Sequence, residues 1–133
     1  MLDGNAFDDD QSLRNLVEQL LTLKASIENY IEPKCYAYIF ARPDVLFYKP
    51  LSIETIINLD NKSIYVPKWQ SYGGCNDRFA ITKNFDVAKS YGNRVNDVLD
   101  FCSINKEPLH SEKLVNFSMR KNNITIKGIN ITF

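Results

Sequence analysis

The fold class of this chain is indicated by the stretch Tyr36-Ala37-Tyr38-Ile39-Phe40-Ala41-Arg42-Pro43-Asp44. Its first six residues are apolar and rich in aromatic side chains, which is typical of a buried strand in a mixed or parallel sheet. In open α/β sheets, ligands bind just beyond the carboxyl ends of such strands. We therefore expect Arg42 and Asp44 to lie where a phosphate group or a metal ion would be held.

Helical and strand-like patterns alternate along the rest of the sequence. The expected helices cover residues 11–31, 52–58, 86–101 and 110–120. The expected strands cover residues 36–41, 63–66, 79–82 and 124–133, the last as a hairpin or one bent strand around Gly128. Residues 68–76 are expected to form a loop. This interleaving predicts one α/β domain over residues 1–133.

Composition and charge narrow the class of protein. The 133 residues include 16 Lys and Arg and 16 Asp and Glu, so a protein that binds nucleic acid mainly through a basic surface is not expected. No apolar run approaches the ~20 residues of a spanning helix, and Asp8-Asp9-Asp10 has the wrong sign for a targeting peptide. The three cysteines form no CxxC pair. We therefore expect a cytosolic protein with reduced thiols and no membrane span.

The first candidate for chemistry is Arg42-Pro43-Asp44 at the end of the first expected strand. Asp44 could bind a divalent cation such as Mg²⁺ or Mn²⁺ that bridges a diphosphate, because hard cations prefer carboxylate oxygens. Arg42 could bind phosphate through its planar guanidinium. The alternative is a turn, in which Pro43 fixes φ and Asp44 bonds the following backbone.

The second candidate is the segment from Gly73 to Ala80. The glycines Gly73 and Gly74 would allow close approach to a ligand, and Asn76-Asp77-Arg78 would then present polar groups to it. Asp77 could act as a general base or hold a substrate hydroxyl. The alternative is a hairpin-like turn with an exposed ion pair.

Three further side chains complete the candidates. Trp69 and Tyr72 flank the glycine loop, where aromatic faces suit a sugar or a base, although packing onto the core is the commoner role. His110 is the only histidine of the chain, and Ser111-Glu112 after it favours a helix start over catalysis.

These segments together match a known pattern. The matching residues are 41–47, 64–69, 73–80, 91–92 and 110–112. In order and spacing the series resembles a family of glycosyltransferases with a GT-A-type fold, known from large DNA viruses of algae and amoebae, from eukaryotic microbes and from plants. The resemblance runs from about residue 11 to the end. It implies a Rossmann-type mixed sheet with flanking helices and, for a viral protein, a location in the host cytoplasm.

The resemblance also implies roles for individual residues. A strand-end Asp-x-Asp motif in GT-A enzymes binds the metal and the diphosphate of the donor, and here Asp44 matches its second position while Arg42 stands at the first. Asn76-Asp77 is similar to the acidic acceptor-side motif, so Asp77 would be the catalytic base. His110 falls in a region that reaches the diphosphate in some GT-A enzymes.

A second departure concerns the start of the chain. Family members begin with a βαβ nucleotide-binding half before the long helix, whereas this chain starts at that helix. The resemblance therefore implies a domain truncated at its N-terminus, with an exposed sheet edge that invites pairing with another chain.

The resulting expectation is a metal-dependent glycosyltransferase domain. It would transfer a sugar from a nucleotide-diphosphate sugar to a glycan or protein hydroxyl, with Asp44 at the metal and Asp77 as base. Arg42, Trp69, Tyr72, Gly73, Gly74, Asn76, Arg78 and His110 would contact the substrates. The alternatives are a non-catalytic binding or assembly protein derived from such an enzyme and, with less support, a metal-dependent hydrolase or nuclease.

Overall fold

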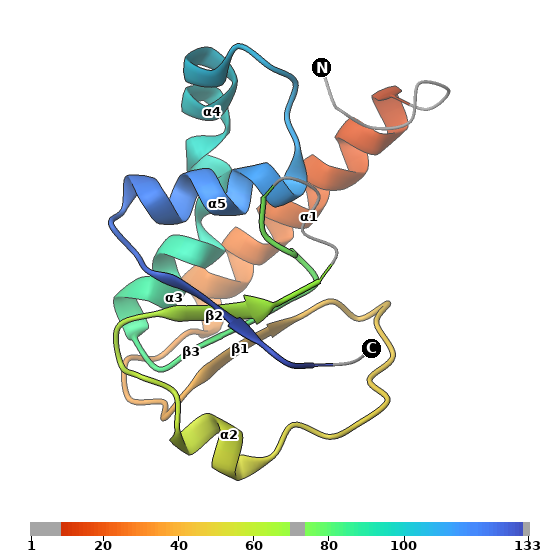
Figure 1. Cartoon of the computed structure of the whole chain (residues 1–133). Helices are drawn as coiled ribbons and strands as arrows, with labels where there is room; N and C mark the ends of the chain where they lie inside the picture. The colour runs from red at the N-terminus through yellow and green to blue at the C-terminus, as the bar shows by residue number, and fades with distance from the viewer. Residues whose placement is uncertain (1–8, 70–73, 132–133) are drawn as a thin grey trace.

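The computed structural model describes residues 9–69 and 74–131 (Figure 1). Helices and short strands interleave along the chain as expected. In chain order the elements are α1 (Asp9–Tyr30), β1 (Tyr38–Ala41), α2 (Ile53–Ile57), β2 (Ile64–Pro67), β3 (Phe79–Thr82), α3 (Phe85–Gly92), the 3₁₀ helix η1 (Arg94–Asp97), α4 (Val98–Asn105), α5 (Ser111–Lys121) and β4 (Ile126–Ile129).

The four strands form one mixed sheet in the order β1-β3-β2-β4, which confirms the α/β class. Strand β3 runs antiparallel to both of its neighbours, and β2 and β4 are parallel. Strands β1, β2 and β4 therefore end at the side of the sheet where β3 begins. That side receives the polar segments that follow β1 and precede β3.

The expectation that residues 36–41 form a buried interior strand is wrong. Only Tyr38–Ala41 are in the strand, and β1 lies at the edge of the sheet, where Ile39 is 49% exposed. The buried central strand is β3, in which all four residues are buried. The error has a physical reason: both segments are short apolar runs, and only the order of pairing decides which one is covered on both sides.

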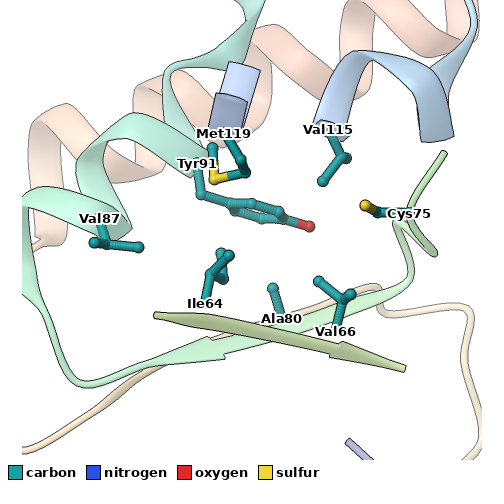
Figure 2. Close-up of a cluster of buried hydrophobic side chains, with 8 residues drawn as sticks. All are labelled: Ile64, Val66, Cys75, Ala80, Val87, Tyr91, Val115 and Met119. Carbon is teal, nitrogen blue, oxygen red and sulfur yellow. The ribbon is translucent and has the colours of Figure 1, made fainter. Parts of the chain in front are cut away.

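The sheet lies between two unequal layers. Helices α1, α3 and α5 cover one face, and the short α2 lies on the other (Figure 1). On the helical face, eight buried side chains form a cluster in which the Tyr91 ring projects between sheet and helices (Figure 2). They are Ile64, Val66, Cys75, Ala80, Val87, Tyr91, Val115 and Met119. Burial of each large apolar side chain of this kind contributes about 1.5–3 kcal/mol.

The single helix expected over residues 86–101 is divided into three pieces. Helix α3 ends at Gly92, η1 follows, and α4 begins at Val98. A Cβ atom at Gly92 would lie 2.0 Å from Cγ1 of Ile27, so only glycine lets α3 approach α1 this closely. The break turns Arg94 inward, where it is buried. No helix of the described residues is long and apolar enough to cross a membrane.

A carboxylate fixes β4 beside β2. The Oδ1 atom of Asp60 accepts hydrogen bonds from the backbone N–H groups of Lys62 and Ser63, at 2.9 and 2.8 Å. Its Oδ2 atom accepts from Lys127 Nζ at 2.6 Å. Because Lys127 pairs with Tyr65 in the parallel β2–β4 ladder, this ion pair joins the turn before β2 to β4. These donors lower the pKa of Asp60 well below its ordinary value, with the Lys127 bond as the largest cause.

We predict that Asp60→Asn lowers the free energy of unfolding at pH 7 by about 1 kcal/mol. A depressed carboxyl pKa stabilises the fold above the unfolded-state value of about 3.9, and this contribution is lost as the pH falls. Urea unfolding of the wild type should therefore show an acid-dependent loss between about pH 5 and pH 2 that is reduced in the variant. Asp86→Asn, which alters an exposed carboxylate, is the control. Equal acid dependence of wild type and Asp60→Asn would contradict the role given to Asp60.

Candidate functional site

The structure brings two of the predicted segments together at one end of the sheet. Ala41, the last residue of β1, pairs with Phe79, the first residue of β3. Beyond that pair, the backbone N–H of Arg42 donates to the carbonyl of Arg78 at 3.4 Å. Residues far apart in the sequence thereby share one edge of the sheet, because β1 and β3 are antiparallel neighbours.

Arg42 and Asp44 form a two-point ion pair. Arg42 Nε lies 3.0 Å from Oδ1 of Asp44, and Nη2 lies 2.6 Å from Oδ2. The pair lowers the pKa of the Asp44 carboxyl and raises the pKa of the Arg42 guanidinium, in both cases chiefly through these hydrogen bonds. Arg42 therefore already occupies both oxygens of the carboxylate that the sequence assigned to a metal.

Asp77 lies close enough to the Arg42–Asp44 pair for its charge to act on Arg42. Its carboxylate accepts a short hydrogen bond from the hydroxyl of Ser111 in the first turn of α5. The charges of Asp77 and Glu112 add to the rise in the pKa of Arg42, and the charge of Arg78 adds to the fall in the pKa of Asp44. The result is a mixed cluster of charges, with the orientation of Asp77 fixed by a neutral donor.

Asn76 and Trp69 hold the loop together from within. Asn76 is fully buried, donates through Nδ2 to the carbonyl of Trp69 at 2.6 Å and accepts from the N–H of Arg78 at 2.9 Å. Trp69 donates through Nε1 to the carbonyl of Ile131 at 2.9 Å. Both polar groups thus support backbone in this structure, and the substrate contacts expected of the two residues stay a prediction. Tyr72 lies outside the described residues.

Gly74 approaches the start of α5. A Cβ atom there would lie 2.2 Å from the carbonyl oxygen of Glu112, which accepts the N–H of Cys75 at 2.9 Å. The requirement for a small residue at Gly74 is therefore explained by this backbone contact, without a ligand. Gly73, the other glycine of the pair, lies outside the described residues.

His110 has the helix-start role that its neighbours favoured. It is the N-cap of α5, and its Nδ1 accepts from the backbone N–H of Lys113 at 3.2 Å. Its Nε2 lies 3.9 Å from Oε1 of Glu112. Nδ1 therefore serves as the hydrogen-bond acceptor of the cap.

A groove of about 920 Å³ runs between α1 and β1 and ends at the charged cluster. Four of the predicted site residues line it: Arg42, Asp44, Asp77 and Arg78. Trp69, Gly74, Asn76 and His110 do not line it. The structure thus separates the described candidates into a group at the groove and a group that supports the loop and α5.

Most residues of the groove were not predicted as site residues from the sequence, among them an aromatic residue and an arginine. Tyr91 and Arg94 line it from the end of α3 and from η1. The Tyr91 ring packs against Phe40 of β1 with 4.8 Å between centroids, and the Arg94 guanidinium lies 4.2 Å from the Tyr91 centroid. The available signal was Gly92-Asn93, a pair that breaks helices and so could have predicted that Arg94 leaves the helical face.

We predict that Gly74→Ala lowers the free energy of unfolding by about 1–3 kcal/mol, because the new methyl group meets rigid backbone of α5. Urea denaturation followed by circular dichroism measures this. Gly128→Ala is the matched control: its Cβ would meet the flexible Lys68 side chain, with Cγ at 2.6 Å. The control should lower stability by less than Gly74→Ala, because the exposed Lys68 side chain can move aside whereas the α5 backbone cannot. A Gly74→Ala protein as stable as this control would show that the loop does not need the close contact.

Comparison of the chain with known proteins found no related protein. No protein-family model, no curated protein and no solved structure matches the chain.

Proposed function

We propose that this chain is a glycosyltransferase-like domain that binds a nucleotide-diphosphate sugar at the end of the sheet and transfers the sugar to a glycan or protein hydroxyl. One observation carries the proposal: Arg42 and Asp44 after β1 meet Asp77 and Arg78 before β3 at the end of one groove. Two cations and two carboxylates at one such site match the needs of a reaction in which a diphosphate leaves and a hydroxyl attacks.

In this proposal the arginines bind the donor. The guanidinium groups of Arg42 and Arg78 would hold the diphosphate, whose negative charge grows as its bond to the anomeric carbon breaks. Arg42 can serve in this way only if its contact with Asp44 opens or is shared, because Asp44 now occupies two of its donors.

Asp77 would act on the acceptor. Its carboxylate would take the proton of the acceptor hydroxyl as the hydroxyl oxygen forms its bond to the anomeric carbon. The Ser111 hydroxyl holds one carboxylate oxygen in place and leaves the other oxygen for the acceptor. A fixed base of this kind removes the cost of ordering the side chain during the reaction.

The described residues do not form a site that fits a divalent cation. Both oxygens of Asp44 contact Arg42, and no group of three His, Cys, Asp or Glu side chains in the described part of the chain could hold a metal ion. Mg²⁺ and Mn²⁺ favour several oxygen ligands. The proposal accordingly assigns the countercharge to arginine and includes no step through a metal.

A second candidate function is a non-catalytic binding protein derived from such an enzyme. The closed Arg42–Asp44 pair favours it, because the pair satisfies both side chains without a substrate. This candidate predicts ligand binding without turnover, whereas the first predicts both.

Calorimetric titration with nucleotide-diphosphate sugars, with and without Mn²⁺, tests the donor site. We expect binding in the millimolar range or tighter, and a loss of about tenfold or more in Arg42→Gln. Absence of binding at millimolar donor would overturn the proposed function.

Release of the nucleotide diphosphate in the presence of acceptor glycans tests the base. Asp77→Asn should keep donor affinity and lose about 10²–10⁴-fold in turnover, because the amide cannot accept the proton. Asp86→Asn, which alters an exposed carboxylate away from the groove, should behave like wild type. Donor binding without turnover by the wild type would favour the non-catalytic candidate, and unimpaired turnover of Asp77→Asn would exclude Asp77 as the base.

A further inference from the structure

Arg94 is a buried cation in the wall of the groove. It is 6% exposed, and its Nη1 donates to the backbone carbonyl of Tyr91 at 3.0 Å. Its Nε has no hydrogen-bond partner among the described residues. None of the ion pairs found in the described part of the chain includes Arg94. By contrast, the groove carboxylates Asp44 and Asp77 both have hydrogen-bond partners.

A buried guanidinium without a countercharge is costly. Removal of an ion from water is unfavourable by several kcal/mol unless a partner of opposite charge or a set of hydrogen bonds compensates it. The carbonyl, the ring and the hydroxyl of Tyr91 all interact with Arg94, and its Nε still has no partner among the described residues. An oxyanion from outside the chain would supply the missing charge, and a planar guanidinium matches phosphate in geometry.

The groove beside Arg94 is long, and apolar side chains make up much of its wall together with the carboxylates of Glu18 and Glu32. Leu16 and Leu23 line it from α1 with part of their surface exposed, whereas Leu20 and Ile27 are almost fully buried. Along α1 the lining continues to Ile31. The distance from Leu20 to Ile31 along the helix axis is about 16 Å, at a rise of 1.5 Å per residue. An extended hydrocarbon chain fits a channel of this shape and polarity better than a compact sugar does.

We propose that the α1–β1 groove binds an amphipathic anion, with a phosphate head group at Arg94 and an alkyl chain along α1. The head group would accept hydrogen bonds from the guanidinium of Arg94, and the chain would cover the exposed apolar surface of α1. The site lies in the same groove as the proposed donor site but uses different residues, Arg94 and the α1 wall in place of Arg42 and Asp77.

Calorimetric titration with three probes tests the chemistry of the ligand. Dodecyl phosphate, used below its micelle concentration, should bind at least about tenfold more tightly than inorganic phosphate, which lacks the chain. The affinity for dodecyl phosphate should also be about tenfold higher than the affinity for dodecyltrimethylammonium, which has the same chain and the opposite charge. Equal affinity for the two dodecyl compounds, or no binding of dodecyl phosphate, would overturn the proposal.

Variants test the residue. Arg94→Gln should weaken dodecyl phosphate at least about tenfold, and Arg94→Lys should restore part of that affinity because it restores the charge. A folded Arg94→Gln protein with unchanged affinity would overturn the proposal. If Arg94→Gln does not fold, the affinity of Gln19→Glu for dodecyl phosphate tests the site instead. Gln19 is an exposed residue of α1 that lines the groove.

Gln19→Glu places a negative charge in the groove and should weaken dodecyl phosphate by about threefold or more. Gln11→Glu, on the same helix but outside the groove, is its matched control and should leave affinity unchanged. Equal affinities of the two glutamate variants would count against the site. Binding of dodecyl phosphate without binding of nucleotide sugars would support this inference and contradict the proposed function. Binding of nucleotide sugars without binding of dodecyl phosphate would support the proposed function and overturn this inference.

Discussion

The structure depends on the burial of β3 between two antiparallel neighbours. All four residues of this strand are buried, two toward the helical layer and two toward α2. Because β1 pairs along its whole length with β3, the strand also determines where the chain after Ala41 can go. The segment at Arg42 is thereby placed beside the segment that leads into β3, and the charged end of the groove is a consequence of this pairing.

Tyr91 connects this sheet to the groove. Its ring lies in the buried cluster on the helical face (Figure 2), packs on Phe40 of β1 and supports the guanidinium of Arg94. Complete burial raises the pKa of its hydroxyl. One aromatic side chain is thus shared by the core and by the wall of a candidate binding site, so packing changes at Tyr91 would be felt at Arg94.

The candidate site was predictable from the sequence only in part. The segments around Arg42 and Asp77 were found because polar residues beside apolar strands are local signals. The sequence could not tell that Asn76 and Trp69 bond to backbone, since that depends on where the loop closes onto Ile131. It could not show that Gly74 lies against the backbone of α5, and it gave no reason to choose Arg94 among 16 basic residues.

The sequence by itself determined the elements and the class of the fold. Helical spacing predicted α1, the Ser52 and His110 caps marked the starts of α2 and α5, and the apolar run at Phe79 predicted β3. These features depend on local backbone preferences, which neighbouring residues encode. Only the tertiary structure decided that β1 is an edge strand, that α3 ends where Gly92 meets Ile27, and that the Nε of Arg94 is buried without a hydrogen-bond partner among the described residues. Each of these depends on contacts between residues far apart in the chain, and a local pattern does not specify them.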